Sequence, residues 1–333
     1  MNINSCHICN SEKLNFLKTI EGYQKGTSYA IGECATCSTQ YVEPCVVDDA
    51  LYQLIYKNAK DIAGYNRYHR YVEEVLEVEN PLVYLGKREA MYWAVAEVLK
   101  QVDSSFNPKI LEVGSGLGYL TYALVKAGYC AKGMDISSNA VINAKAKFGD
   151  YFECNNIFDI AILPENQFDV IVLNEVIEHV TNPVAFIEKL LSLLTPEGKL
   201  VVTTPNKSAC LAGSIWDTEL PPIHLYWFSE KSMECIAERL DAKVTFLSFR
   251  EFNRKSLNLI RFRNYKPFER TAILDENGNV CNPMPLGKRK VLNEVIKKVL
   301  LTAINLPVIG KLLARPDISI DKLNTLAAVF EKK

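Results

Sequence analysis

The sequence predicts an α/β protein: a doubly wound, mostly parallel sheet with a small metal-binding module at the N-terminus and helical additions. An apolar strand, Lys109 to Val113, runs through a glycine-rich turn into a helical run from Tyr119 to Ala127. Apolar strands then alternate with helical runs, the pattern of a parallel sheet with crossover helices. Two C-x-x-C pairs stand before this region. The last strand, Leu323 to Glu331, is expected to run antiparallel to its neighbours.

The composition is that of an ordinary globular protein. Of the 333 residues, 48% are hydrophobic and 23% charged, with a formal net charge of -1, which excludes a disordered or fibrous chain. No general affinity for nucleic acid is expected. The N-terminus has no signal pattern and no apolar run approaches the ~18 residues of a membrane span, so we expect a cytoplasmic protein.

The chain is long for one domain, and it divides into three parts. Residues 1–47 form a zinc ribbon in this division, and residues 48–104 form a helical connector or lid. Residues 105–333 form the main domain, with an insertion at about 251–320.

The two cysteine pairs predict one tetrahedral zinc site. Each C-x-x-C turn points two sulfurs at one metal, and the segment between the pairs is long enough for a short hairpin. Four thiolates leave no open position, so the Zn²⁺ would be structural; a redox pair is the alternative. His7 is expected to be a bystander, and the other six cysteines small core residues. The predicted metal ligands are Cys6, Cys9, Cys34 and Cys37.

The stretch from Asp48 to about Val102 has apolar and aromatic residues at helical spacing, interrupted at Asn80-Pro81. We expect two or more helices that cover the site of the main domain. Its aromatic residues either contact a substrate or pack in the core: Tyr65, Tyr68, His69 and Tyr71.

The glycine turn by itself is compatible with two kinds of cofactor. Glycines permit positive φ and let a ligand approach the backbone, as in the G-x-G-x-x-G turn of dinucleotide-binding folds. Here the spacing is G-x-G-x-G, and Glu112 stands two positions before Gly114. Asp135 ends the second strand, where a carboxylate accepts hydrogen bonds from ribose hydroxyls of either cofactor.

Four motifs in order resemble the class I S-adenosylmethionine-dependent methyltransferases, in the branch with ubiquinone-type O-methyltransferases and deoxysugar C-methyltransferases. The resemblance spans roughly 109–250 and implies a seven-stranded, Rossmann-like sheet that binds S-adenosylmethionine. Asn156 stands where the family usually has Asp. The motifs are Leu111-Glu-Val-Gly-Ser-Gly-Leu-Gly118, Gly133-Met-Asp-Ile-Ser137, Phe168-Asp-Val-Ile-Val-Leu-Asn-Glu-Val-Ile-Glu-His-Val180 and Leu194-Thr-Pro-Glu-Gly-Lys-Leu-Val-Val-Thr-Thr-Pro-Asn206.

The same resemblance implies which residues bind the cofactor. Glu112, Gly114 and Gly116 would hold the methionine end, Asp135 the ribose, and Asn156 with Ile157 the adenine. The full predicted set is Glu112, Gly114, Ser115, Gly116, Asp135, Ile136, Asn156, Ile157 and Asn174.

Methyl transfer needs an aligned acceptor and, where the acceptor carries a proton, a base. His179 and His224 both follow carboxyl ends of strands, where the ligand crevice of a parallel sheet lies. We predict His224 as the general base, whereas His179 either assists or only secures its turn. Ile223 stands where the sugar branch often has Glu, so C- and O-methylation both stay open. The predicted catalytic set is His224, His179, Tyr226 and Glu175. Glu175 and Glu178 either orient the two rings or are solvated turn residues, and Tyr226 either points into the site or packs in the core.

The insertion contains a basic amphipathic run, 287–300, followed by an apolar run, 304–313. It is a lid, a dimer surface or a peripheral membrane contact. We expect a methyltransferase of a small polar acceptor, a sugar or sugar nucleotide. One alternative is an O-methyltransferase of a quinone-like or lipid-linked acceptor at a membrane surface. The other is a zinc-ribbon binding module on a methyltransferase-like scaffold.

Overall fold

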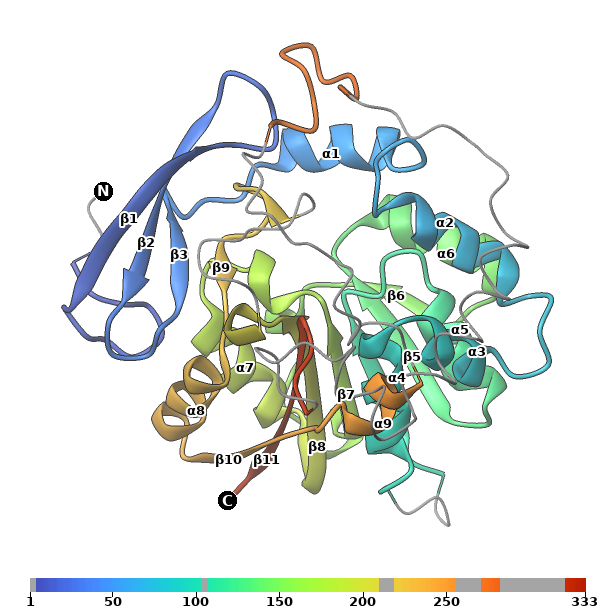
Figure 1. The fold of residues 1–333 in the computed structure, drawn as a ribbon. Coiled ribbons are helices and arrows are strands. Elements are labelled where there is room, and N and C mark those ends of the chain that lie inside the picture. The colour runs from blue at the N-terminus through green and yellow to red at the C-terminus, as the bar shows by residue number, and fades with distance from the viewer. Residues whose placement is uncertain (1–3, 103–106, 210–218, 256–270, 282–320) are drawn as a thin grey trace, which may run out of the picture.

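The main domain is built on a seven-stranded sheet (Figure 1). The computed structural model describes residues 4–102, 107–209, 219–255, 271–281 and 321–333. Within the described part of this sheet, β11 runs antiparallel to both of its neighbours and the other strand pairs are parallel, as the sequence predicts. The order is β10 (Ala242–Phe246), β11 (Thr325–Lys332), β8 (Leu194–Pro205), β7 (Phe168–Asn174), β4 (Lys109–Val113), β5 (Cys130–Asp135) and β6 (Phe152–Cys154).

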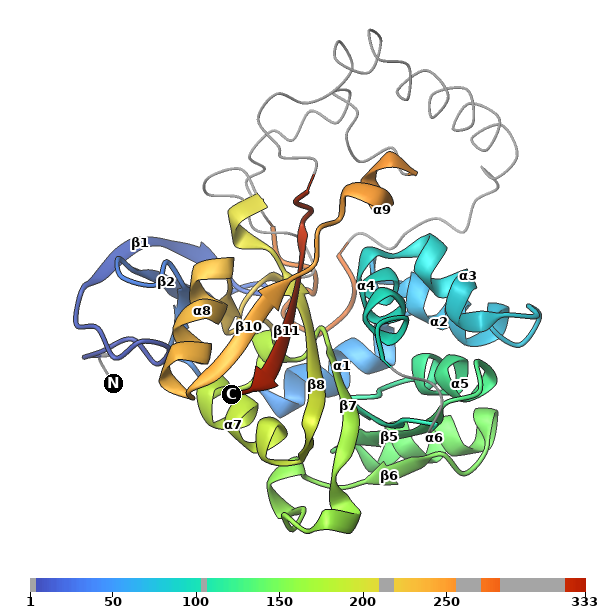
Figure 2. The same ribbon diagram turned by 90° about the horizontal axis from the view of Figure 1, so that it is seen from below.

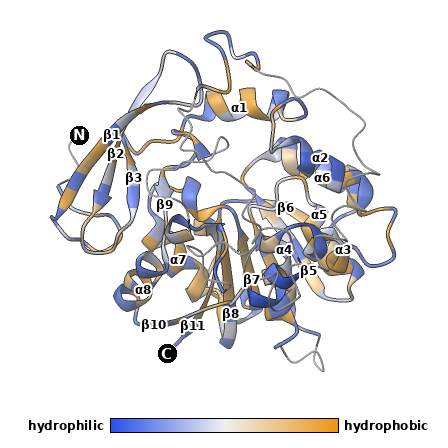
Figure 3. Cartoon of the chain, in the orientation of Figure 1, coloured by the Kyte–Doolittle hydropathy of each residue, from blue (hydrophilic) through white to orange (hydrophobic). Residues whose placement is uncertain are grey.

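Helices cover both faces of this sheet (Figure 2). Along β7, Val170 and Val172 face one layer of helices and Ile171 and Leu173 the other, because successive side chains of a strand point to opposite faces. Strand β7 is accordingly apolar over most of its length, whereas the outward sides of the helices are hydrophilic (Figure 3). One layer consists of α4 (Ala90–Leu99), α5 (Tyr119–Lys126) and α6 (Ser138–Phe148), and the other of α7 (Pro183–Ser192) and α8 (Glu230–Arg239).

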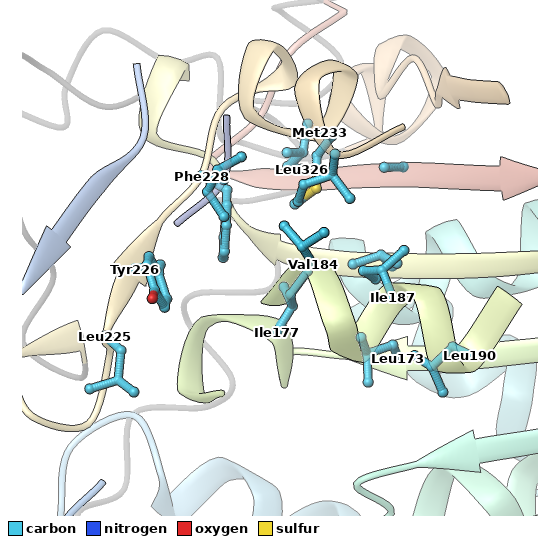
Figure 4. Packing of buried hydrophobic residues seen from close by; sticks show 14 of the residues in the cluster. Leu173, Ile177, Val184, Ile187, Leu190, Leu225, Tyr226, Phe228, Met233 and Leu326 are labelled. Carbon is cyan, nitrogen blue, oxygen red and sulfur yellow. The ribbon is translucent and has the colours of Figure 1, made fainter. Parts of the chain in front are cut away.

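The second layer shows how local sequence signals place these helices. Asn182 caps α7 by accepting a hydrogen bond from the Ala185 amide, with Pro183 at the first helical position. Ser229 and Ser232 form a capping box at the start of α8. Figure 4 shows α7, α8 and β11 meeting in one core, to which Leu173, Ile177, Val184, Ile187, Leu190, Leu225, Tyr226, Phe228, Met233 and Leu326 contribute.

The N-terminal module forms a separate antiparallel sheet that is completed by the main domain. The sequence predicts a short hairpin here. The structure adds a further strand, β9 (Tyr226–Trp227), which pairs with β3 so that Tyr41 lies opposite Tyr226. The chain that carries His224 is therefore tied to the module by backbone hydrogen bonds. The sheet order is β1 (Leu14–Glu21), β2 (Ser28–Cys34), β3 (Gln40–Glu43) and β9.

Helices connect the two sheets, as predicted. The break at Asn80-Pro81 is confirmed, since the Asn80 side chain caps a helix that begins at Pro81. None of the helices in the described ranges is long and apolar enough to cross a membrane. The predicted runs 287–300 and 304–313 lie outside the described residues. The remaining helices are α1 (Asp49–Asn58), α2 (Asn66–Glu74), α3 (Pro81–Arg88) and α9 (Arg250–Arg254).

Residues 271–281 of the predicted insertion lie against the N-terminal module. The amides of Ile273 and Leu274 both donate to the Tyr23 carbonyl, at 2.9 and 3.0 Å. The Ala272 amide donates to the Glu21 carboxylate at 3.0 Å. This part of the insertion therefore joins the module rather than the sheet of the main domain.

Candidate functional site

The glycine turn after β4 leaves backbone open to a ligand. Gly114 and Gly116 have φ of 75° and 48°, in the left-handed region that favours glycine. A Cβ on Gly114 would lie 2.5 Å from Val176, whereas one on Gly116 would meet no atom within 4 Å. The buried Ser115 hydroxyl has no hydrogen-bond partner among the described residues. The turn thus has open space at Gly116, next to the Ser115 hydroxyl that has no partner among the described residues.

Asp135, at the end of β5, fixes the shape of this turn. One carboxylate oxygen accepts a hydrogen bond from the Gly116 amide at 2.8 Å, and the other accepts one from Ser137 at 2.9 Å. A carboxylate has about four acceptor positions, so it can still accept bonds from ligand hydroxyls. The next side chain, Ile136, is 80% exposed. Asp135 therefore holds the glycine turn next to the exposed apolar side chain of Ile136.

Glu112 is buried beneath the turn, and the Thr121 hydroxyl donates to its carboxylate. Burial raises the pKa of Glu112 to about 8, against the opposing effect of the Thr121 hydrogen bonds, and the charge of Asp135 adds to the rise. Near pH 7 this carboxyl is largely protonated in the ligand-free protein. A cationic group placed beside it would draw the proton off.

The two residues predicted to bind the adenine, Asn156 and Ile157, both make contacts within the protein. The Asn156 side chain accepts from the Phe158 amide at 3.1 Å and so caps the short helix η1 (Ile157–Asp159). Ile157 is only 3% exposed and packs in the core, whereas Phe158 is 50% exposed. The exposed ring at this corner is therefore Phe158, which the sequence prediction missed. Asn174 accepts a hydrogen bond from the Thr203 hydroxyl at 2.9 Å.

Four titratable residues converge after β7, and we call them the acid–histidine cluster: Glu175, Glu178, His179 and His224. Glu175 has a φ of 56°, and the helix η3 (Ile177–His179) follows it. The rings of His179 and His224 meet edge to face, with centroids 4.7 Å apart. Because β4 and β7 are parallel neighbours, the cluster and the glycine turn lie at the same edge of the sheet.

The hydrogen bonds of His179 fix its tautomer. Its Nδ1 lies 2.7 Å from the Ile223 carbonyl oxygen, which can only accept, so Nδ1 carries the hydrogen. The Tyr52 hydroxyl lies 3.1 Å from the same nitrogen. Burial lowers the pKa of His179, so the ring is neutral and Nε2 keeps a lone pair. His179 therefore offers a basic nitrogen toward Glu178, whose Oε1 lies 3.8 Å away.

The pKa values of the other three members of the cluster are also shifted from their ordinary values. Burial raises the pKa of Glu178 to about 7, and burial with the neighbouring charge of Glu178 raises the pKa of Glu175 well above its ordinary value. Burial, and then the repulsion that would arise if His179 were protonated as well, lowers the pKa of His224 well below its ordinary value. Among the described residues, no hydrogen-bond partner exists for Glu175 Oε1, Glu178 Oε1 or His224 Nδ1.

Tyr226, predicted with the catalytic residues, is not brought to the cluster. Its hydroxyl lies 2.5 Å from His7 Nδ1 and donates to the Thr181 carbonyl at 3.0 Å. The Cys45 thiol lies 3.3 Å from the same oxygen. Its ring stacks on Phe228 in the core (Figure 4). Tyr226 therefore links the N-terminal module to the main domain, and His7 is its partner.

The tyrosines of the connector form an aromatic layer. Tyr65 and Tyr68 meet edge to face at 6.1 Å, and Tyr71 contacts both Tyr92 and Tyr119, the residue that begins α5. The Tyr71 hydroxyl donates to Glu89 at 2.6 Å. Mutual packing accounts for these contacts, and a substrate-binding role for Tyr65 or Tyr68 stays a prediction.

The four predicted ligand cysteines come together in the N-terminal module. Their sulfurs all lie within 4.8 Å of one another, with Cys6–Cys37 and Cys9–Cys34 both at 3.5 Å. This is the arrangement of a four-thiolate site. The expectation that the other cysteines are core residues is wrong for three of them, since strand ends and a loop leave them at the surface, and Cys210 lies outside the described residues. The exposed ones are Cys130, Cys154 and Cys281.

Comparisons with known proteins agree with this geometry. A family model described as a methyltransferase domain matches residues 68–246, more than half of the chain. The ubiquinone biosynthesis O-methyltransferase of Coxiella burnetii is 30% identical over 131 residues, which is 37% of this chain and 56% of that protein. That of Rhodopseudomonas palustris is 32% identical over 132 residues, 39% of this chain and 52% of that protein. The chain thus spans about half the length of these curated relatives.

A comparison of folds gives a more distant likeness. The solved structure of the plantazolicin methyltransferase BpumL in complex with SAH is 15% identical in sequence, with a TM-score of 0.41. The match covers 86% of this chain and 98% of that chain.

Proposed function

The chain belongs to the methyltransferase-domain family, and on that premise we propose that it transfers the methyl group of S-adenosylmethionine to an oxygen of a small polar acceptor. The matched residues run from α2 to β10 and so contain the glycine turn and the whole acid–histidine cluster. The observation that carries the proposal is that these two groups share one edge of the sheet. An added Cβ at Gly114 would touch Val176, which lies between Glu175 and Glu178.

The residues at the turn fit this cofactor. The cofactor supplies a methyl sulfonium, whose sulfur is a good leaving group. Its α-ammonium would find the buried Glu112, and its ribose the Asp135 carboxylate. Its carboxylate would accept a hydrogen bond from the unpartnered Ser115 hydroxyl, beside the open space at Gly116. The exposed side chains of Ile136 and Phe158 offer apolar surface to the adenine. The ammonium, carboxylate and ribose of the ligand therefore each have a residue of suitable chemistry.

We expect cofactor binding to release a proton near pH 7. The pKa of Glu112 is about 8 in the ligand-free protein, and the α-ammonium beside it would lower that value. Calorimetry in buffers of different ionisation enthalpy measures the release. It should be present between about pH 5 and 8, and Glu112→Gln should abolish it. Equal proton release by the wild type and Glu112→Gln would contradict the placement of the ammonium group.

The acid–histidine cluster is where the acceptor would lose its proton. His224 is the base that the sequence predicts, but its side chain is more deeply buried than that of His179. His179 presents Nε2 with a lone pair and is 24% exposed, so we propose that the acceptor hydroxyl approaches this ring first. The curated relatives are named as O-methyltransferases, which supports oxygen over carbon.

The nature of the acceptor can be tested by methyl transfer. Labelled S-adenosylmethionine is incubated with the protein and either a catechol-type quinol precursor or a nucleotide sugar, and the labelled product is identified. Label on a hydroxyl oxygen supports the proposal; label on carbon overturns the choice of oxygen. Transfer to the quinol alone favours the quinone-like acceptor, and transfer to the sugar nucleotide alone favours the saccharide.

The four cysteines of the N-terminal module fit a structural Zn²⁺, with no position left for a substrate. Thr39 lies 3.1 Å from the Cys37 sulfur and donates to Ser232 at the start of α8. Arg239, at the end of α8, donates to the carbonyls of His7 and Ile8 in the first cysteine turn. A metal here would therefore stiffen the contact between the module and the main domain.

A further inference from the structure

We propose that Glu178, His179 and His224 form a second metal site, which binds a divalent cation beside the acceptor. One carboxylate oxygen and two imidazole nitrogens of these residues lie within 4.8 Å of one another. Ligand atoms at about 2.0–2.2 Å from a tetrahedral, zinc-sized cation are about 3.3–3.6 Å apart, so a pair at the 4.8 Å limit would have to close by about 1.2 Å. Two imidazoles and one carboxylate are a ligand set of catalytic metal sites.

The three groups converge without bonding to one another. Glu178 Oε1 and His179 Nε2 are 3.8 Å apart, too far for a hydrogen bond and close enough for both to bind one ion between them. Glu178 Oε1 and His224 Nδ1 are buried, and neither has a hydrogen-bond partner among the described residues. Buried polar atoms without partners are costly, and their presence in two residues whose ligand atoms lie within 4.8 Å of one another indicates a missing ligand.

Hydrogen bonds hold the atoms of His179 and Glu178 that would not bind the metal, as a metal site requires. His179 donates its Nδ1 hydrogen to the Ile223 carbonyl at 2.7 Å, which aims the lone pair of Nε2. The Thr204 hydroxyl donates to Glu178 Oε2 at 2.8 Å and leaves Oε1 unused. Such outer hydrogen bonds orient metal ligands and set the imidazole tautomer. These two hydrogen bonds thus leave Glu178 Oε1 and His179 Nε2 free for a ligand.

A bound cation explains this arrangement better than a proton relay through the three side chains does. A relay would need hydrogen bonds between the carboxylate and the rings, and the 3.8 Å separation does not provide one. The cation's role rests on the proposed function: three protein ligands leave a position for the acceptor oxygen, and a hydroxyl bound to a divalent cation ionises more readily. The imidazoles would then serve as ligands, and the proton of the bound hydroxyl would pass to solvent water instead of to His179.

Mn²⁺ is the probe that tests this site, because thiolates favour zinc and the cysteine site would keep its own metal. Electron paramagnetic resonance follows free Mn²⁺ during titration of the full chain. We expect about one bound Mn²⁺ per chain and at least about 10-fold weaker binding in Glu178→Gln. Glu188→Gln, an exposed carboxylate on α7, is the matched control and should bind as the wild type does.

The outcomes separate this proposal from the proposed function. Absence of Mn²⁺ binding in the wild type, or equal binding in Glu178→Gln, overturns the metal site even if methyl transfer is observed. S-adenosylmethionine affinity is measured on the same samples, and its retention shows that each variant is folded. If Glu178→Gln does not fold, His179→Asn replaces it with the same expected loss. Mn²⁺ binding without binding of the cofactor would refute the proposed function and keep the metal site.

Discussion

Replacing His179 by alanine is expected to lower kcat by about 10²- to 10⁴-fold and to leave the affinity for S-adenosylmethionine unchanged. In the proposed function the ring would supply a lone pair to the acceptor, either by taking its proton or by binding a cation beside it. It lies on η3, after β7, and makes no contact with the Gly116 backbone or Asp135 on which the cofactor would lie. Single-turnover kinetics with the identified acceptor measures the effect.

The matched control is His69→Ala, a half-buried histidine on α2 outside the acid–histidine cluster. It should keep kcat within a few-fold. His224→Ala should behave as His179→Ala does, because the two rings are in contact. Full turnover in His179→Ala would show that the proton leaves elsewhere, and an equal loss in His69→Ala would show that the effect is one of folding.

Replacing Cys34 by serine is expected to remove the zinc and to lower both the melting temperature and kcat. Small structural zinc modules owe much of their folding free energy to the metal. Through the pairing of β3 with β9, the module also supports the segment that carries His224. Metal analysis of the purified protein should find about one tightly bound zinc in the wild type and none in the variant.

Cys130→Ser provides the control, because Cys130 is an exposed thiol outside the metal cluster. It should keep zinc, stability and turnover. The affinity for S-adenosylmethionine should persist in Cys34→Ser, since the glycine turn belongs to the other sheet. A native protein without zinc, or a fully stable Cys34→Ser variant, would contradict the structural role of the metal.

The sheet of the main domain was predictable because its signals are local. The buried strand Lys109–Val113 is followed directly in the sequence by the glycine turn and a helix. The spacing of hydrophobic residues identifies such strands and helices. The cysteine site was equally predictable, since two C-x-x-C turns can meet at one metal. The sheet is confirmed in the structure, down to the antiparallel β11, and the four cysteine sulfurs come together as predicted. Their binding of zinc stays a prediction.

The contacts between distant segments were not predictable in this way. β9 has two residues, and only its partner β3, far away in the sequence, makes it a strand. For the same reason the position of Tyr226 beside His7 carries no sequence signal. The exposure of Phe158 depends on η1 turning Ile157 inward, which a propensity pattern does not specify.

The acid–histidine cluster was predictable only in part. Glu175, Glu178 and His179 occupy one short segment, so the sequence identified them together. Their ionisation and the tautomer of His179 depend on burial and on the Ile223 carbonyl, which only the fold supplies. The sequence therefore indicated the residues of the cluster, and the structure indicates what each atom is free to do.

Calorimetric titration of S-adenosylmethionine into the wild type and Asp135→Ala tests the central claim most directly. Asp135 shapes the turn through Gly116 and would accept bonds from the ribose, and charged hydrogen bonds contribute about 1.5–3 kcal/mol each. We predict one binding site in the wild type, about 10- to 100-fold weaker binding in Asp135→Ala, and no change in the exposed control Asp150→Ala. Equal affinity in all three proteins, or no binding to the wild type, would contradict the account.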